Sequence, residues 1–185
     1  MNIAPTRLLL SVVLTLSLLA AYSNAVADAI SATALGQRTM SKFMVNLAKF
    51  VTWPEDKFIS DFAPYKYCMM GDDPFAGTFD TAVLDKQTKN RGFQVARIGL
   101  EDLDAAKSCH VVFVNVPDVE KALGVINSLD GLPILTVGEV ENFAQYGGMV
   151  GFLGEGRNIA LAVNQKRLEK AGLKGSSRLY RASDM

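Results

Sequence analysis

The sequence contains a single histidine, His110, and only two cysteines, Cys68 and Cys109. A Ser-His-Asp site would have to use His110, which lies at the start of a very apolar segment. A zinc site normally takes four ligands, or three and a water, and these residues reach that number only with a carboxylate. No C-x-x-C motif is present, which argues against thioredoxin-like exchange. We therefore expect no catalytic, metal-ligating or cofactor-binding residues.

Net charge is also lacking, because 19 basic residues balance 19 acidic ones. The chain has no basic patch of the kind that nucleic-acid-binding proteins carry, so nucleic acid is not an expected partner. Glycine-rich loops give no signal either. Neither Gly147-Gly148 nor Gly154-x-Gly156 opens a helix after a strand, so neither indicates a dinucleotide-binding loop.

Long apolar runs are absent after Ala27, so we expect no stable membrane insertion. The run at residues 8–22 is about 15 residues long, whereas a membrane-spanning helix takes roughly 20. It follows Arg7 and precedes Ala25-Val26-Ala27, the order of a secretory signal peptide. We expect cleavage after Ala27, with Ala25 as a second candidate site and an uncut membrane anchor as the alternative. The mature chain, residues 28–185, would then be a single domain outside the cytoplasm.

The two cysteines are an even number in a chain that we expect to reach an oxidising compartment. This favours a disulfide between Cys68 and Cys109. The alternative is a pair of separate buried thiols, which behave as small apolar residues.

Hydrophobic patterning indicates alternating strands and helices along the mature chain. The expected helices are 34–51, 75–84, 117–129, 139–146, 165–171 and a short tail at 176–182. The expected strands are 67–70, 93–98, 109–116, 133–137, 149–153 and 158–163. Because the strands are continuously apolar, both faces of the sheet should be covered. The pattern predicts a three-layer α/β sandwich with a mostly parallel sheet and a C-terminal antiparallel hairpin.

Acidic residues follow two of the expected strands. Asp72 and Asp73 come directly after 67–70, and Glu139 follows 133–137. Ligands of open α/β sheets bind at the carboxyl ends of strands, so these three residues are a candidate ligand loop. The alternative is structural, with Asp73 as a helix N-cap and Pro74 at the first helical position.

Aromatic residues gather between the first expected helix and the first expected strand. Most should belong to the core, but an exposed subset would form an interface of the kind that uses aromatic anchors. We take Phe50, Trp53, Met149 and Phe152 as the candidate partner surface. The same region of the sequence includes Phe58, Phe62 and Tyr65.

Several segments in this order and spacing resemble a known family. They are Lys49-Phe50-Val51-Thr52-Trp53-Pro54, Tyr67-Cys68-Met69-Met70-Gly71-Asp72-Asp73-Pro74-Phe75, Cys109-His110-Val111-Val112-Phe113-Val114, Leu135-Thr136-Val137, Phe143-Ala144, Gly147-Gly148-Met149-Val150-Gly151-Phe152, Asn164, Ala171-Gly172-Leu173 and Ser176-Ser177-Arg178-Leu179-Tyr180. The set is similar to the YfiR family of periplasmic regulators, from about Met40 to Ala182.

The resemblance implies an α/β periplasmic protein without known catalytic activity. Such a protein binds the periplasmic portion of an inner-membrane diguanylate cyclase and represses it, which restrains cyclic-di-GMP signalling and biofilm formation. The family pattern has cysteines at the positions of Cys68 and Cys109. A further pair that occurs near the Gly-Gly segment is missing here, where Tyr146 and Phe152 stand instead. The usual aspartate after the second cysteine is His110.

Our reading is therefore a periplasmic repressor that acts by binding, with redox sensitivity through the cysteines as a further hypothesis. The first alternative is a periplasmic small-molecule-binding protein with its site near Asp72, Asp73 and Glu139. The second is an enzyme that uses Cys109 and His110, although adjacent residues of a strand point to opposite sides. Whether the chain forms a homodimer stays open.

Overall fold

The computed structural model describes residues 29–116, 118–155 and 158–181, so the predicted signal peptide lies outside the described residues. Its helices and strands are, in chain order, η2 (Ile30–Ala32), α2 (Ala34–Phe50), β1 (Val51–Thr52), η3 (Glu55–Lys57), β2 (Tyr65–Gly71), α3 (Thr78–Val83), β3 (Phe93–Ile98), α4 (Leu103–Lys107), β4 (Val111–Asn115), α5 (Val119–Ser128), β5 (Leu135–Gly138), β6 (Val150–Glu155), β7 (Asn158–Val163), α6 (Gln165–Lys170), β8 (Lys174–Gly175) and α7 (Ser177–Arg181).

Six strands form the main sheet in the order β3-β2-β4-β5-β6-β7. The first five strands of that order are parallel, and β7 pairs with β6 in an antiparallel hairpin. The short strands β1 and β8 form a separate antiparallel pair. This topology confirms the predicted mostly parallel sheet with a C-terminal antiparallel hairpin.

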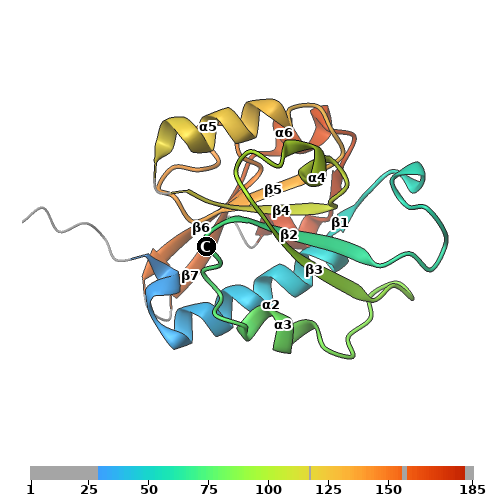
Figure 1. Ribbon diagram of the computed structural model, residues 1–185, viewed down its shortest axis with the longest axis horizontal. Helices are drawn as coiled ribbons and strands as arrows, with labels where there is room; N and C mark the ends of the chain where they lie inside the picture. The colour runs from blue at the N-terminus through green and yellow to red at the C-terminus, as the bar shows by residue number, and fades with distance from the viewer. Residues whose placement is uncertain (1–28, 117, 156–157, 182–185) are drawn as a thin grey trace, which may run out of the picture.

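The sheet separates two hydrophobic cores, and Figure 1 shows helices on both of its faces. Alternate residues of a strand point to opposite faces. Tyr67 and Met69 of β2 therefore join the core beneath α2 and α3, together with Phe113 of β4. Cys68 and Met70 join the core beneath α4 and α5. The predicted three-layer sandwich is confirmed, and burial on both faces explains why the central strands are continuously apolar.

Helix α2 begins at a capped N-terminus and ends near the predicted boundary. The side chain of Thr33 accepts a hydrogen bond from the backbone N–H of Gly36 at 3.0 Å. Gly36 is needed here because a Cβ atom would lie 1.8 Å from the carbonyl oxygen of Ile30. The C-terminal half of α2 then leads directly into β1.

One predicted helix is shorter than expected, and another is missing. Residues 75–84 were expected to be helical, but α3 begins only at Thr78, because Ala76 and Gly77 have positive φ angles of 46° and 80°. Residues 139–146 form turns rather than a helix, and Asn142 has a φ of 59°. A left-handed residue interrupts helical hydrogen bonding, and hydrophobic periodicity gives no warning of it.

Among the described residues, no helix has both the length and the apolar character that crossing a membrane would require.

Candidate functional site

The segment between β1 and β2, residues 53–64, extends beyond the end of the main sheet (Figure 1). We call it the β1–β2 loop. Proline at positions 54 and 64 disfavours helical geometry at the residue before each, Trp53 and Ala63. At its start the indole N–H of Trp53 donates a hydrogen bond of 3.0 Å to the backbone carbonyl of His110, and Trp53 is only 5% exposed. The loop therefore begins at a point that is fixed to the sheet.

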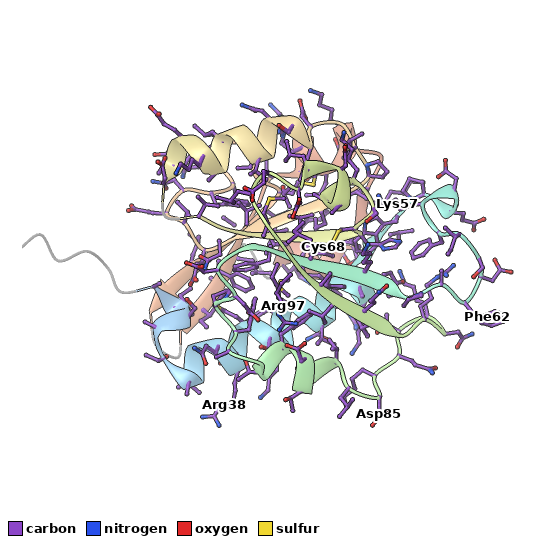
Figure 2. All side chains as sticks on the ribbon, viewed as in Figure 1. Arg38, Lys57, Phe62, Cys68, Asp85 and Arg97 are labelled. Carbon is purple, nitrogen blue, oxygen red and sulfur yellow. A yellow bond between two sulfur atoms is a disulfide. The ribbon has the colours of Figure 1, made fainter. Side chains whose placement is uncertain are left out.

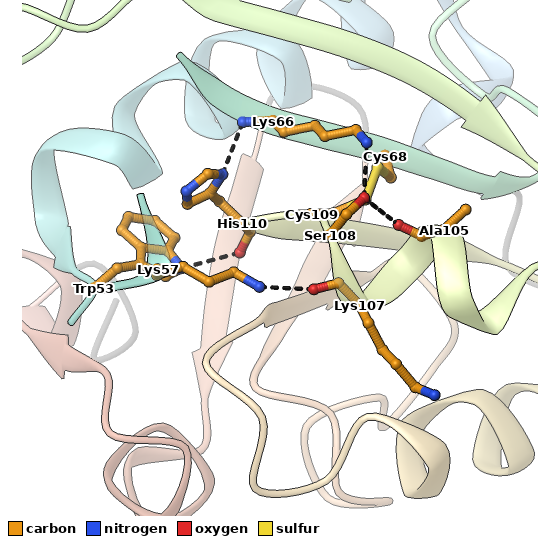
Figure 3. The surroundings of a disulfide bond; sticks show 9 residues. All are labelled: Trp53, Lys57, Lys66, Cys68, Ala105, Lys107, Ser108, Cys109 and His110. Carbon is orange, nitrogen blue, oxygen red and sulfur yellow. Dashed lines mark hydrogen bonds between the residues drawn. A yellow bond between two sulfur atoms is a disulfide. The ribbon is translucent and has the colours of Figure 1, made fainter. Parts of the chain in front are cut away.

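His110 lies directly under this loop and is buried. Its Nδ1 atom accepts a hydrogen bond of 3.0 Å from the backbone N–H of Lys66 (Figure 3). The backbone N–H of His110 donates to the Lys66 carbonyl. A neutral ring with Nδ1 as acceptor carries its proton on Nε2. Among the described residues Nε2 has no hydrogen-bond partner. Burial lowers the pKa of His110 to about 4, and the charges of Lys57, Arg91 and Lys66 add to the effect.

Phe58 joins the loop to His110. Its ring stacks on the imidazole with centroids 4.3 Å apart and meets Tyr65 edge to face. The guanidinium carbon of Arg91 lies 3.8 Å from the centroid of the same ring. The Nη1 atom of Arg91 donates to the backbone carbonyls of Ser60 at 2.7 Å and of Ala63 at 2.9 Å. One arginine thus holds both sides of the turn at the tip of the loop.

The disulfide holds the segment on which the loop rests. Cys68 in β2 and Cys109 just before β4 are bonded, with Cα atoms 6.1 Å apart, as the sequence predicted (Figure 3). Next to Cys109, the backbone carbonyl of Lys107 accepts a hydrogen bond of 2.8 Å from Nζ of Lys57. Burial lowers the pKa of Lys57. The loop, the histidine and the disulfide therefore form one connected unit.

Two large apolar side chains of the loop remain in solvent. Ile59 is 98% exposed and Phe62 is 78% exposed. Figure 2 shows Phe62 at the outer tip and Lys57 close to the body of the protein. Single exposed apolar residues are ordinary on protein surfaces, but neighbouring ones on an anchored projection are typical of interaction sites. We take this tip as the candidate functional site.

Replacing Arg91 by methionine is expected to loosen the tip. The change removes two charge-assisted hydrogen bonds and the contact with Phe58, and we expect the free energy of unfolding to fall by about 1–2 kcal/mol. Amide hydrogen exchange in residues 58–63 should rise by about tenfold or more. The matched control is Arg38→Met at an exposed helical site. Unchanged exchange in Arg91→Met would show that the loop is ordered by other contacts.

The structure does not assemble the candidate ligand loop. Asp73 accepts hydrogen bonds from Nη2 of Arg97 at 2.7 Å and from the backbone N–H of Phe75 at 2.9 Å. The carboxylate of Glu139 accepts from the backbone N–H and the hydroxyl of Ser31. Of the three acids, only Asp72 is exposed and makes no side-chain hydrogen bond or ion pair with the described residues. Asp73 and Glu139 therefore fix neighbouring segments and leave no converging set for a ligand. The N-cap alternative is wrong, because Asp73 closes a turn and α3 begins only at Thr78, with Gly77 as its N-cap.

The structure places most of the predicted partner surface in the interior of the protein. Trp53 is buried, and Met149 and Phe152 are each only 2% exposed within the core beneath α2. Phe50 is half-buried and packs against the same core. Trp53, Met149 and Phe152 therefore stabilise the fold and are not available to a partner.

The structure also argues against an enzyme that uses Cys109 and His110. The sulfur of Cys109 is bonded to Cys68, so it is not a free nucleophile in this structure. His110 is held by Lys66 and covered by Phe58. Within the part of the chain that the structure describes, no group of three or more His, Cys, Asp or Glu residues could hold a metal ion.

Sequence reasoning noticed Phe62 only as one aromatic of a group and missed both Ile59 and Arg91. A signal was present, since Phe58-Ile59 and Phe62-Ala63 stand among charged and small residues with no helical or strand period. Apolar residues outside any periodic segment are candidates for exposure. The role of Arg91, about 30 residues further along the chain, becomes visible only in the folded structure.

Comparison with known proteins places this arrangement in a family. Residues 37–183 match the family described as YfiR/HmsC-like. The match includes most of α2, the whole main sheet, the disulfide and the β1–β2 loop. This family is periplasmic and regulatory, is not known to be catalytic, and implies a partner protein in signalling. Because the match spans most of its 185 residues, the chain belongs to the YfiR/HmsC-like family.

Proposed function

We propose that the chain is a periplasmic repressor of an inner-membrane diguanylate cyclase. In this proposal residues 1–27 are removed as a signal peptide, and residues 28–185 fold as a single domain in the periplasm. The mature chain binds the periplasmic portion of the cyclase and keeps it inactive. Cyclic-di-GMP signalling and biofilm formation are restrained as a result. Membership of the YfiR/HmsC-like family supports this class of function.

The observation that carries the proposal is the exposed and anchored tip of the β1–β2 loop. Ile59 and Phe62 stand in solvent, whereas Phe58 and Arg91 fix the backbone between and beside them. A loop that is already ordered loses little conformational entropy when it binds. Large side chains that insert into a partner's pocket commonly contribute most of the binding energy. The tip therefore has the physical properties of a preformed protein-binding site.

Repression places a thermodynamic requirement on this contact. A bound protein shifts a conformational equilibrium only by its difference in affinity for the two states. The chain must therefore bind the inactive cyclase more tightly than the active one. By the same linkage, any signal that activates the cyclase weakens its affinity for the chain.

The proposal is tested by deleting the gene from the source bacterium and measuring cellular cyclic-di-GMP. We expect the level to rise, and to fall again when the wild-type gene is restored. Deleting the responsible cyclase as well should cancel the rise, and this double deletion identifies the partner. A level of cyclic-di-GMP that does not respond to the first deletion would refute the proposed function.

A further inference from the structure

The tip of the β1–β2 loop carries charge as well as apolar surface. Ser60 and Ala63 close a tight turn through a backbone hydrogen bond of 3.2 Å, which presents Phe62 within the turn and Ile59 just before it. The exposed charged side chains of the loop are all acidic, and they are Glu55, Asp56 and Asp61. Apolar and negative groups therefore share the outer surface of this loop.

The positive groups of the same region face inwards. Lys57 is the only cation of the loop, and its Nζ atom is bonded to the Lys107 carbonyl at 2.8 Å. The guanidinium of Arg91 is occupied by the carbonyls of Ser60 and Ala63. In contrast, the carboxylates of Asp56 and Asp61 are exposed and make no hydrogen bond or ion pair with the other described residues. Neither acid is therefore paired with a cation at the tip.

From this arrangement we infer that the tip inserts Ile59 and Phe62 into an apolar pocket on a protein partner, and that lysine or arginine side chains rim this pocket. The inference rests on the proposed function for the identity of the partner, which is the periplasmic portion of the cyclase. Complementary charge at the rim of an interface speeds encounter and fixes orientation, while buried apolar anchors supply affinity.

The charges argue against two other occupants. A bacterial membrane surface carries anionic phospholipids, which repel acidic side chains and attract basic ones. A membrane-inserting loop would therefore be expected to carry outward lysines beside Ile59 and Phe62, but here Lys57 is turned inwards. Two copies of this chain that met tip to tip would place Asp56 and Asp61 against the same acids of the second copy. Like charges at an interface oppose such pairing.

The experiment compares variants for binding to the purified periplasmic portion of the cyclase that the double deletion identifies. The variant Ile59→Ser with Phe62→Ser should lose on the order of 100-fold in affinity. The variant Asp56→Lys with Asp61→Lys should lose about tenfold, and added salt should no longer weaken its binding. The matched control is Leu84→Ser, because Leu84 is 67% exposed on α3's C-terminal side, outside the loop. It should bind like the wild type.

Two further measurements test the alternatives, a membrane surface and a second copy of this chain. The wild-type chain should not float with vesicles of phosphatidylethanolamine and phosphatidylglycerol. If the wild-type chain floats and the Ile59→Ser, Phe62→Ser variant does not, the loop binds a membrane and the inference is overturned. Sedimentation should show no dimer that depends on these two residues, and such a dimer would overturn it in favour of a second copy. Unchanged binding by either loop variant would also overturn it.

The experiments distinguish a wrong contact surface from a wrong proposed function. If deletion of the gene raises cyclic-di-GMP but the Ile59→Ser, Phe62→Ser variant still restores a low level, the repressor stands and the loop is not its contact. If deletion changes nothing, the proposed function itself fails. The folded state of each variant is checked by thermal unfolding, which these exposed substitutions should leave unaltered.

Discussion

Replacing Cys68 and Cys109 together by alanine is expected to lower the free energy of unfolding by about 4 kcal/mol. The disulfide links residues that are 41 positions apart. Without it, the unfolded chain gains the conformational freedom that closure of this loop removes. Both cysteines are almost fully buried, at 1% and 0% exposure, so the sulfurs also contribute packing beneath α4 and α5. A loss of this size is a large part of the stability of a small domain.

Urea unfolding of the wild type and the double variant, each with and without reductant, measures this effect. The wild type should be destabilised by reductant, whereas the double variant should not respond. The substitution should also weaken partner binding, because the segment beside Cys109 holds both Lys57 and His110. Equal stability of the two proteins under oxidising conditions would contradict a structural role for the bridge. Equal repression would show that it is no redox switch.

Acidification is expected to destabilise the protein between about pH 6.5 and pH 4 through His110. Burial lowers the pKa of this group from 6.5 to about 4 in the folded state. The unfolded chain therefore takes up a proton first as the pH falls. The stability contributed by neutral His110 is complete above pH 6.5 and is lost as the pH decreases towards 4. A shift of one pKa unit corresponds to about 1.4 kcal/mol, so we expect a loss of about 3 kcal/mol.

The control for this prediction is His110→Asn. An asparagine side chain can accept the hydrogen bond from the Lys66 backbone with its oxygen, yet it does not titrate. Its unfolding free energy should be nearly flat over the same pH range, apart from contributions of other groups. Lowered pKa values place the acids Asp80, Asp104 and Asp130 below this window. Identical pH profiles for the wild type and His110→Asn would show that His110 is not responsible.

The fold followed from the sequence wherever periodicity and burial acted together. Residues 34–51 repeat apolar side chains on one helical face, and α2 begins at the predicted residue. The strand beginning at Val111 is apolar on both faces because it lies in the middle of a covered sheet. Two apolar runs separated by a short glycine-containing loop predicted the hairpin of β6 and β7. In each case local preference and tertiary environment favour the same structure.

The residues of the candidate functional site could not be predicted in the same way. Trp53, Met149 and Phe152 are as hydrophobic as Phe62, and hydrophobicity alone does not distinguish a core residue from an exposed anchor. Exposure depends on where the chain turns and on what holds the turn. Here that role belongs to Arg91, whose contacts with Ser60 and Ala63 join segments about 30 residues apart. A single sequence carries no local signal for such a contact.

We propose that the mature chain represses a diguanylate cyclase by binding it directly. The most direct measurement is the rate of cyclic-di-GMP synthesis by the purified full-length cyclase in lipid nanodiscs, with increasing amounts of the mature chain. We expect the rate to fall to a plateau as the wild-type chain is added, and to fall much less with the Ile59→Ser, Phe62→Ser variant. A rate that stays constant at saturating amounts of folded wild-type chain would contradict it.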